Sequence, residues 1–221
     1  MERIDYLPHH EDIKIIQDDE MFCINTDTEV LGEFIEVYKE DTVLEIGTNN
    51  GALLLYASRF NPKKLIGIDI NKKALDLAKR NLELNKVDAS LIEADGNSFC
   101  LEKEADVVIF NPPYFKVLKD EKVKNEYLRL AKHEENFPLE SMISCVDRNL
   151  RNGGTLFFLF ETKRMIEVIN ELEKHHLVIK EMKFIYDINK DNSNVFIIKA
   201  VKNAKSGLNV KKPIIIDRNN K

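Results

Sequence analysis

Residues 43–51 read Val43-Leu44-Glu45-Ile46-Gly47-Thr48-Asn49-Asn50-Gly51. This stretch begins as an apolar strand, runs directly into a glycine-containing turn, and is followed by an apolar helical pattern. Glycine lets the backbone turn tightly and lets a ligand approach without a Cβ in the way. Because such turns also occur for structural reasons alone, the ends of the other strands have to be compared with this one.

Strand and helix patterns alternate around this stretch, which predicts a parallel sheet covered by helices. The expected strands are Thr42–Ile46, Lys64–Ile70, Ser90–Glu93, Ala105–Phe110 and Thr155–Phe160. The expected helices are Ala52–Arg59, Lys72–Asn85, Pro138–Leu150, which ends before a turn at Gly153-Gly154, and Lys163–Lys174. Two final strands, Leu177–Tyr186 and Val195–Val201, predict an antiparallel hairpin. The expected fold class is therefore α/β, with a mostly parallel seven-stranded sheet that ends in an antiparallel hairpin.

Residues 1–40 are expected to form an N-terminal strand and helix extension. Short strands are predicted at Ile13–Ile16 and Met21–Ile24. A capping box, Thr26-Asp27-Thr28-Glu29, then opens a helix to about Tyr38. Residues 41–202 would form the main domain, and residues 203–221 a basic C-terminal segment.

Acidic residues stand at the ends of two further strands. Asp69 ends the second strand, 18 residues after Gly51, where a carboxylate can accept hydrogen bonds from both hydroxyls of a ribose. Asp95 and Gly96 follow the third strand. A dinucleotide dehydrogenase would more naturally retain a full G-x-G-x-x-G for its pyrophosphate. The G-x-x-x-G spacing here favours a cofactor without phosphates.

The fourth strand runs into Asn111-Pro112-Pro113-Tyr114. An exocyclic or amide nitrogen is a poor nucleophile because its lone pair is delocalised. The Asn111 side-chain carbonyl and the Pro112 backbone carbonyl can each accept an N–H of such a group and stabilise developing positive charge. Proline rigidifies the second carbonyl, and Tyr114 can stack on a flipped-out base. This segment predicts methylation of a planar amino group.

The three strand ends together resemble the class I S-adenosyl-L-methionine methyltransferases, which have a Rossmann-like fold, over roughly residues 40 to 200. That family most often has a second glycine where Asn49 stands, and Asn tolerates left-handed backbone angles better than other non-glycine residues. The resemblance implies a set of cofactor-binding residues: Thr26, Asp27, Glu45, Gly47, Thr48, Asn49, Gly51, Asp69, Ile70, Asp95 and Gly96. It also implies the catalytic residues Asn111, Pro112, Pro113 and Tyr114.

Two further segments resemble the bacterial tRNA adenine N6-methyltransferases of the valine-tRNA type, which act beside the anticodon. The segment from Thr26 to Gly32 is similar to the T-D-x-x-L-L of that family. Ala131-Lys132-His133-Glu134 is similar to its A-R-H-E, with Lys132 in place of the arginine. The resemblance implies S-adenosyl-L-methionine as cofactor, adenine N6 as target and tRNA as partner.

The net charge of −5 hides an asymmetry, because residues 199–221 carry +6 and the remainder −11. An acidic protein that binds RNA needs local basic patches. The candidate RNA-binding residues are Lys116, Lys119, Lys132, His133, Lys202, Lys205, Lys211 and Lys212. The three cysteines are widely spaced and favour no metal site. No apolar stretch approaches the roughly 20 residues needed to span a membrane, and the chain does not begin like a secretory signal, so we expect a cytoplasmic protein.

Three other functions remain open at this point. A protein N5-glutamine methyltransferase of the release-factor type uses the same N-P-P-Y chemistry, although it usually carries a helical bundle before the cofactor motif. A guanine N2 methyltransferase of ribosomal RNA often has Phe where Tyr114 stands. The third is a non-catalytic RNA-binding module of the same fold. A DNA adenine methyltransferase, in contrast, would need a larger recognition domain than Phe115–Phe137 provides.

Overall fold

The computed structural model describes residues 1–112 and 137–217. Within them, the seven strands that the sequence predicts lie side by side in one sheet. Their order is β8-β9-β7-β6-β3-β4-β5. Their bounds are β3 (Thr42–Ile46), β4 (Lys64–Asp69), β5 (Ser90–Glu93), β6 (Ala105–Phe110), β7 (Leu150–Glu161), β8 (Leu177–Asp187) and β9 (Val195–Lys202).

The strand order reverses direction beside β3, which pairs in parallel with β4 on one side and β6 on the other. β5 and β7 extend the parallel set, and β9 is antiparallel to both β7 and β8. This is the mostly parallel sheet with an antiparallel hairpin that the sequence predicts. In open α/β sheets, ligands bind outside the carboxyl ends of the strands at the point where the order reverses. Here that point lies between β3 and β6.

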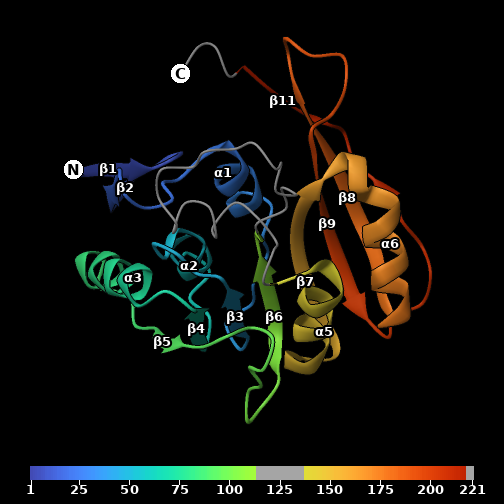
Figure 1. Cartoon of the computed structure of the whole chain (residues 1–221), viewed down its shortest axis with the longest axis horizontal. Coiled ribbons are helices and arrows are strands. Elements are labelled where there is room, and N and C mark those ends of the chain that lie inside the picture. Colours follow the sequence, from blue (N-terminus) through green and yellow to red (C-terminus); the bar gives the residue numbers. More distant parts are fainter. Residues whose placement is uncertain (113–136, 218–221) are drawn as a thin grey trace.

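Two short strands after residue 202 belong to the sheet. β10 (Asn209–Val210) and β11 (Ile214–Ile216) each pair in parallel with the edge strand β8, so that the sheet has nine strands in the described part of the chain. The expectation of a separate basic segment after residue 202 missed these two strands. Figure 1 shows the β8–β9 hairpin and β11 extending away from the rest of the sheet.

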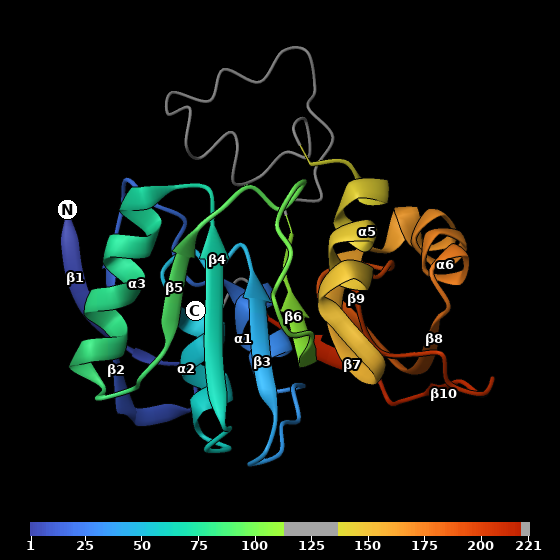
Figure 2. The ribbon, with the colours of Figure 1, turned by 90° about the horizontal axis from the view of Figure 1, so that it is seen from below.

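Helices cover both faces of the sheet (Figures 1 and 2). α1, α2 and α3 lie on one face, and α5 and α6 on the other. Their bounds are α1 (Thr26–Gly32), α2 (Ala52–Ser58), α3 (Lys72–Leu84), α5 (Leu139–Asn149), a 3₁₀ turn η1 (Thr162–Arg164) and α6 (Met165–Lys174). No helix in the described ranges is both long and apolar enough to cross a membrane.

The expected turn at Gly153-Gly154 lies inside β7. β7 begins at Leu150, and its pairing with β6 shifts register between Ala105 and Val107. Gly153 has a positive φ of 74°, a backbone conformation that favours glycine. The two glycines therefore mark an irregularity within a long strand, and the predicted strand at Thr155–Phe160 was too short.

The N-terminal extension differs from the prediction in three respects. A strand at the very start, β1 (Glu2–Leu7), pairs antiparallel with β2 (His10–Asp18), whereas the sequence predicted no strand before residue 13 and a strand only at 13–16 within β2. Residues 21–24 form no strand. The N-cap of α1 is Asn25, whose side chain accepts a hydrogen bond from the backbone N–H of Thr28, so the predicted Thr26 cap was one residue late.

α1 ends at Gly32, earlier than the predicted end near Tyr38. A Cβ at Gly32 would lie 2.3 Å from the ring of Tyr56, so the close approach of α1 to α2 needs a glycine there. After Gly32 the apolar residues Phe34, Ile35 and Val37 are buried without helical structure. The apolar pattern that predicted a longer helix reflects burial of these residues in a connecting segment.

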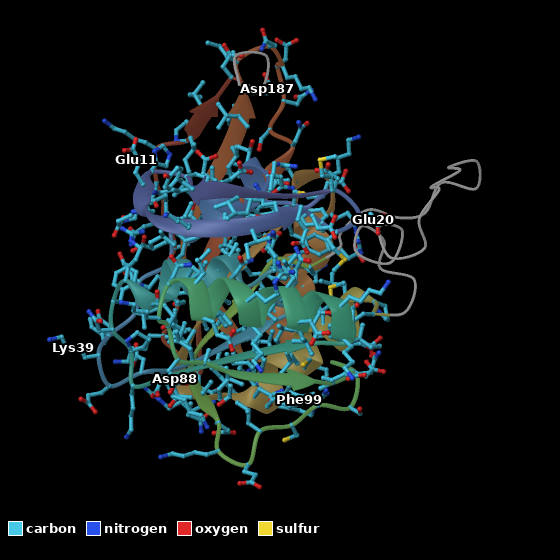
Figure 3. All side chains as sticks on the ribbon, turned by 90° about the vertical axis from the view of Figure 1, so that its left-hand side faces the viewer. Glu11, Glu20, Lys39, Asp88, Phe99 and Asp187 are labelled. Atoms are coloured by element: carbon cyan, nitrogen blue, oxygen red, sulfur yellow. The ribbon has the colours of Figure 1, made fainter. Side chains whose placement is uncertain are left out.

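The β1–β2 hairpin lies alongside α3 (Figure 3). The Asn81 side chain of α3 accepts a hydrogen bond from the N–H of Ile16, at 2.6 Å, and donates one to the carbonyl of the same residue. Asn81 also donates to the backbone carbonyl of Asn50, at 2.9 Å. One buried side chain thus joins the hairpin to the turn after β3.

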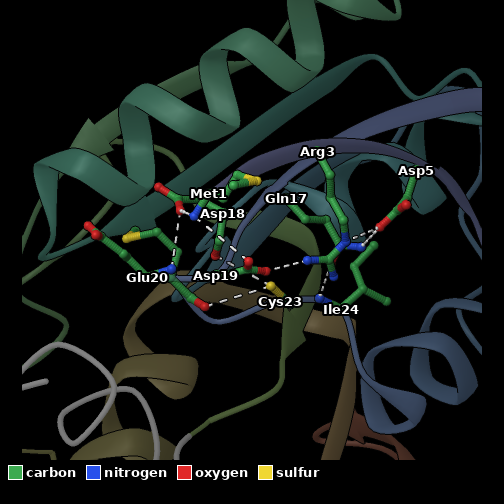
Figure 4. A network of polar contacts seen from close by, with 10 residues as sticks. Met1, Arg3, Asp5, Gln17, Asp18, Asp19, Glu20, Cys23 and Ile24 are labelled. Carbon is green, nitrogen blue, oxygen red and sulfur yellow. Dashed lines mark hydrogen bonds and ion pairs between the residues drawn. The ribbon is translucent and has the colours of Figure 1, made fainter. Parts of the chain in front are cut away.

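The hairpin also holds the segment that leads into α1 (Figure 4). The Gln17 side chain accepts a hydrogen bond from the N–H of Ile24, at 2.7 Å, and donates one to Asp5. The Cys23 thiol donates to the carbonyl of Asp18. These contacts fix residues 22–25 beside the carboxyl end of β3.

Candidate cofactor and amino-group site

The turn after β3 has the backbone that its glycines predict. Gly47 and Gly51 have φ values of 69° and 80°. Asn49 has a φ of 47°, so it adopts the left-handed conformation expected for the second glycine of the motif. A Cβ at Gly47 would meet nothing within 4 Å. The backbone there faces open space that a ligand can enter.

Asp69 is joined to this turn by hydrogen bonds. One carboxylate oxygen accepts from the N–H of Asn49, at 2.9 Å, and the other accepts from the N–H of Asn71, at 2.8 Å. Burial raises the pKa of Asp69 above its ordinary 3.8, while these backbone N–H groups hold back part of the rise. Asn49 and Asp69 both belong to the predicted cofactor set and are 20 positions apart in the sequence. They are therefore in direct contact.

Glu45 and Thr48 lie beneath the turn. Both are buried, and the Thr48 hydroxyl donates to the Glu45 carboxylate at 2.6 Å. Burial raises the pKa of Glu45 well above its ordinary value, and the hydrogen bond from Thr48 opposes this rise. The N–H of Thr48 donates to the carbonyl of Ile68 on β4. These two side chains brace the turn from inside the protein.

Ile70 and Asp95 lie on neighbouring strand ends. Asp69 is in register with Glu93, and the N–H of Ala94 donates to the carbonyl of Asp69. Ile70 is 66% exposed. Asp95 is exposed too, and its carboxylate accepts hydrogen bonds from the backbone and side chain of Asn97. An apolar surface and an acid thus border the same edge of the sheet.

Asn111 and Pro112 follow β6 directly beside the glycine turn. Ile46, the last residue of β3, is in register with Phe110, the last residue of β6. Asn111 is half-buried and Pro112 is buried. The structure therefore brings the first half of the Asn-Pro-Pro-Tyr segment next to Gly47. Pro113 and Tyr114 lie outside the described residues.

Thr26 and Asp27 form the first turn of α1, and Asp27 is buried. The segment before them contacts the glycine turn, because the Asn49 side chain donates to the carbonyl of Phe22 at 2.6 Å. The sequence suggested a role for Thr26 and Asp27 at this site, and this contact brings their segment to it. The contact between Phe22 and Asn49 itself could not be foreseen.

The candidate RNA-binding lysines have different environments. Lys205 and Lys212 are exposed, and Lys211 pairs with Glu181 at 3.4 Å. The Lys202 ammonium instead pairs with Asp147 and donates to the carbonyls of Asp147 and Leu150, with a side chain only 14% exposed. The Lys202 side chain therefore caps the C-terminal end of α5. The other candidates, Lys116, Lys119, Lys132 and His133, lie outside the described residues.

Some supporting residues were not predicted. Asn71 is the N-cap of α3, where its side chain accepts hydrogen bonds from the N–H groups of Lys73 and Ala74. An Asn directly before a helical pattern is a recognisable N-cap signal. The role of Asn81 had no such signal, because its partners are 65 and 31 residues away. Among the residues that the structure describes, no cluster of His, Cys, Asp and Glu is arranged to hold a metal ion.

Residues 12–186 match the protein family described as methyltransferase small domain. A candidate protein N5-glutamine methyltransferase of Methanocaldococcus jannaschii is 39% identical over 102 residues, 46% of this chain and 50% of that protein. The release factor glutamine methyltransferase of Flavobacterium psychrophilum is 30% identical, over 64% of this chain and 53% of its own length. The tRNA1(Val) (adenine(37)-N6)-methyltransferase of a Flavobacteriaceae bacterium is 32% identical, over 62% and 59%. The match to these relatives spans 50% to 59% of their lengths.

A solved structure has a similar fold. The crystal structure of the tRNA m1G37 methyltransferase of Methanocaldococcus jannaschii has a TM-score of 0.65 and 18% sequence identity to this chain. The similarity covers 92% of this chain and 57% of that one. At this identity the similarity concerns the fold, which is the Rossmann-like fold of the class I methyltransferases.

Proposed function

This chain belongs to the methyltransferase small domain family, whose cofactor is S-adenosyl-L-methionine, and we propose that it methylates the exocyclic N6 amino group of an adenine in tRNA. The resemblance of its short motifs points to the position beside the anticodon. The observation that carries the proposal is the location of Asn111 and Pro112, directly beside the glycine turn at the point where the strand order reverses.

Three features of this edge fit the cofactor. The open space at Gly47 admits a ligand against the backbone. The carboxylate of Asp69, oriented by two backbone N–H groups, suits the ribose hydroxyls. The Asn50 side-chain nitrogen is buried without a partner among the described residues, and a buried donor of this kind needs an acceptor. We assign Ile70 and Asp95 to the adenine ring and its amino group.

Asn111 and Pro112 would prepare the target nitrogen. When bound, S-adenosyl-L-methionine supplies an electrophilic methyl group on its sulfonium sulfur. The Asn111 side-chain carbonyl and the Pro112 backbone carbonyl accept the two amino N–H groups and direct the nitrogen lone pair toward that methyl. The nitrogen would take the methyl group from the sulfonium, which would leave as a neutral thioether, and one amino proton would then leave to solvent. This chemistry needs no general base from the protein.

We assign Pro113 a role in rigidifying this segment and Tyr114 a role in stacking on the target base. A base must leave its stack before its amino group can reach a buried cofactor. Stacking on an aromatic side chain contributes about 1 to 3 kcal/mol per base. A phenyl ring would supply the same stacking surface, so Tyr114→Phe should retain activity that Tyr114→Ala loses.

Support for adenine in tRNA comes from outside the Asn-Pro-Pro-Tyr segment. The Thr26–Gly32 segment and Ala131-Lys132-His133-Glu134 both resemble the tRNA family, and the relative from the Flavobacteriaceae bacterium bears that name. The second candidate is methylation of a glutamine side-chain amide in a release factor, which the names and identities of the other two relatives favour. A non-catalytic RNA-binding role has less support, since the strand-end residues are all present. Guanine N2 methylation has less support because such enzymes often have Phe where Tyr114 stands.

We propose that RNA is gathered by two groups of basic residues, one that follows the Asn-Pro-Pro-Tyr segment in the sequence and one in the C-terminal segment. The proposed set is Lys116, Lys119, Lys132, His133, Lys205, Lys211 and Lys212. Lys202 loses support because its ammonium is already bonded within the protein. β11 runs parallel to β8, so its carboxyl end points toward the edge where the substrate would bind.

The test compares methyl acceptors. The protein is incubated with S-adenosyl-L-methionine carrying a labelled methyl group and, separately, with unmodified total tRNA, ribosomal RNA or a release factor. We expect label in tRNA, and far slower labelling with the Asn111→Ala variant. Label in the release factor would instead establish the glutamine candidate, and failure of S-adenosylhomocysteine to bind would support a non-catalytic module.

A further inference from the structure

The loop after β5 carries Asp95 but has little regular structure of its own. Its internal bonds are those of a short turn, in which the N–H groups of Ser98 and Phe99 donate to the carbonyl of Asp95. The chain then continues to Leu101 without helix or strand. Asn97 orients the carboxylate of Asp95 within the loop, and contacts from elsewhere must hold the loop itself in place.

Arg148, near the end of α5, supplies most of these contacts. One guanidinium nitrogen donates to the carbonyls of Gly96 and Asn97, at 2.9 and 3.0 Å. A second nitrogen donates to the carbonyl of Phe99, at 3.4 Å, and the third is held by the Ser144 hydroxyl at 2.9 Å. A single side chain thus binds three backbone carbonyls of the loop.

Two further residues, one at the end of α5 and one just before it, contact the loop. The buried Asn149 side chain accepts a hydrogen bond from the N–H of Leu101, at 2.7 Å, and donates to the carbonyl of Phe99. The ring of Phe137, just before α5, covers Gly96 so closely that a Cβ there would lie 2.6 Å from it. The same ring contacts Phe110, with centroids 5.9 Å apart, and Phe110 precedes Asn111.

We propose that Arg148 is a positioning residue that holds the loop after β5, and with it Asp95, in the geometry that recognises the adenine ring of the cofactor. This inference rests on the proposed cofactor role of Asp95. The planar guanidinium has five N–H donors in a rigid fork, which suits three carbonyls at once. A lysine ammonium keeps the charge but lacks the fork, so charge alone cannot replace Arg148.

The experiment measures discrimination between two ligands that differ at one group. Native protein, Arg148→Lys and Arg148→Ala are titrated calorimetrically with S-adenosylhomocysteine and with S-inosylhomocysteine, which has a carbonyl in place of the adenine amino group. Native protein should prefer the adenine ligand, because a carboxylate accepts from an amino group and repels a carbonyl. In both variants the ratio of the two affinities should fall about tenfold, the difference expected for a charge-assisted hydrogen bond.

Arg151→Ala is the matched control. Arg151 also makes an ion pair, with Asp106, but at the opposite edge of the sheet where Asp106 accepts from the N–H of Thr42. It should keep the native preference. If Arg148 had a purely structural role, its substitution would weaken the binding of both ligands by the same factor. That result, or an unchanged preference, would overturn the proposal. Equal affinity of the native protein for the two ligands would instead refute the adenine role of Asp95 itself, and with it the role of Arg148.

Discussion

Asp69 and Asn111 stand on either side of β3, after β4 and β6. Asp69 is fixed by two backbone N–H groups. Asn111 is half-buried and directly follows the strand that pairs with β3. We assign the first to cofactor binding and the second to the target amino group, so their substitutions should have separable effects.

Asp69→Ala should weaken binding of S-adenosylhomocysteine by about tenfold or more, the loss expected for hydrogen bonds to a charged group. Asn111→Ala should leave that affinity within about threefold, yet lower the rate of methyl transfer by roughly 10²–10³, as loss of an oxyanion-hole donor does. Calorimetry and single-turnover kinetics measure the two quantities. An equal loss of affinity in both variants would mean that the two half-sites are wrongly assigned.

Glu45 makes stability depend on pH. Its pKa is raised by burial, so the folded protein holds this proton more tightly than the unfolded chain. Its contribution to stability is therefore full below the unfolded pKa and is lost as the pH rises through the folded pKa. Glutamine imitates the protonated acid and does not titrate.

Relative to Glu45→Gln, the native protein should lose stability as the pH rises above the ordinary pKa of 4.5. The slope should approach, at most, about 1.4 kcal/mol per pH unit. Urea unfolding at a series of pH values measures this difference. Two curves that stay parallel from acidic to neutral pH would show that burial does not perturb this carboxyl.

Contacts that follow from the strand order could be predicted from the sequence. Contacts that depend on how a helix packs could not. The turn, Asp69 and Asn111 each stand where a strand ends, so the parallel sheet brings them together. Arg148 lies 52 residues from Gly96, and its role depends on how α5 packs. No periodicity or spacing records that packing.

At the scale of elements, the end of the chain offers a test of the RNA surface. Lys205, Lys211 and Lys212 lie beside β10 and β11, whereas Lys202 closes the end of α5. Changing the first three together to Ala should lower the slope of tRNA affinity against salt. The expected decrease is somewhat under one unit for each phosphate that these lysines neutralise.

Lys202→Ala is the contrasting variant. It should leave that slope unchanged and lower the free energy of unfolding by about 1 to 3 kcal/mol, because Asp147 and two carbonyls lose their donor. Filter binding at several salt concentrations and urea unfolding give the two readouts. An unchanged slope in the triple variant would remove the C-terminal segment from the RNA surface.

The strands and helices from β3 to β9 were predicted to within a few residues, apart from the early start of β7, because burial imposes a clear period on them. β1 was missed because most of its side chains are exposed on both faces, so no alternation appears. β10 and β11 have only two and three residues. Such short strands exist only because β8 offers an open edge, which a pattern cannot reveal.

For the whole molecule, the net charge of −5 works against binding a polyanion. A substrate of this kind must therefore be met by local positive charge near the site. The β8–β9 hairpin and β11 extend beyond the body of the sheet (Figure 1), and β8, β10 and β11 run in one direction. We propose that this arrangement supplies a surface for the tRNA substrate beyond the single nucleoside that is methylated.

The identity of the methylated product distinguishes the proposed function from its alternatives in a single measurement. Unmodified tRNA is treated with the protein and S-adenosyl-L-methionine, digested to nucleosides and analysed by mass spectrometry, with Asn111→Ala in parallel. We predict that N6-methyladenosine accumulates with the native protein and forms far more slowly with the variant. Methyl transfer that yields N2-methylguanosine, or that appears only as N5-methylglutamine when a release factor is the acceptor, would contradict the assignment to adenine in tRNA.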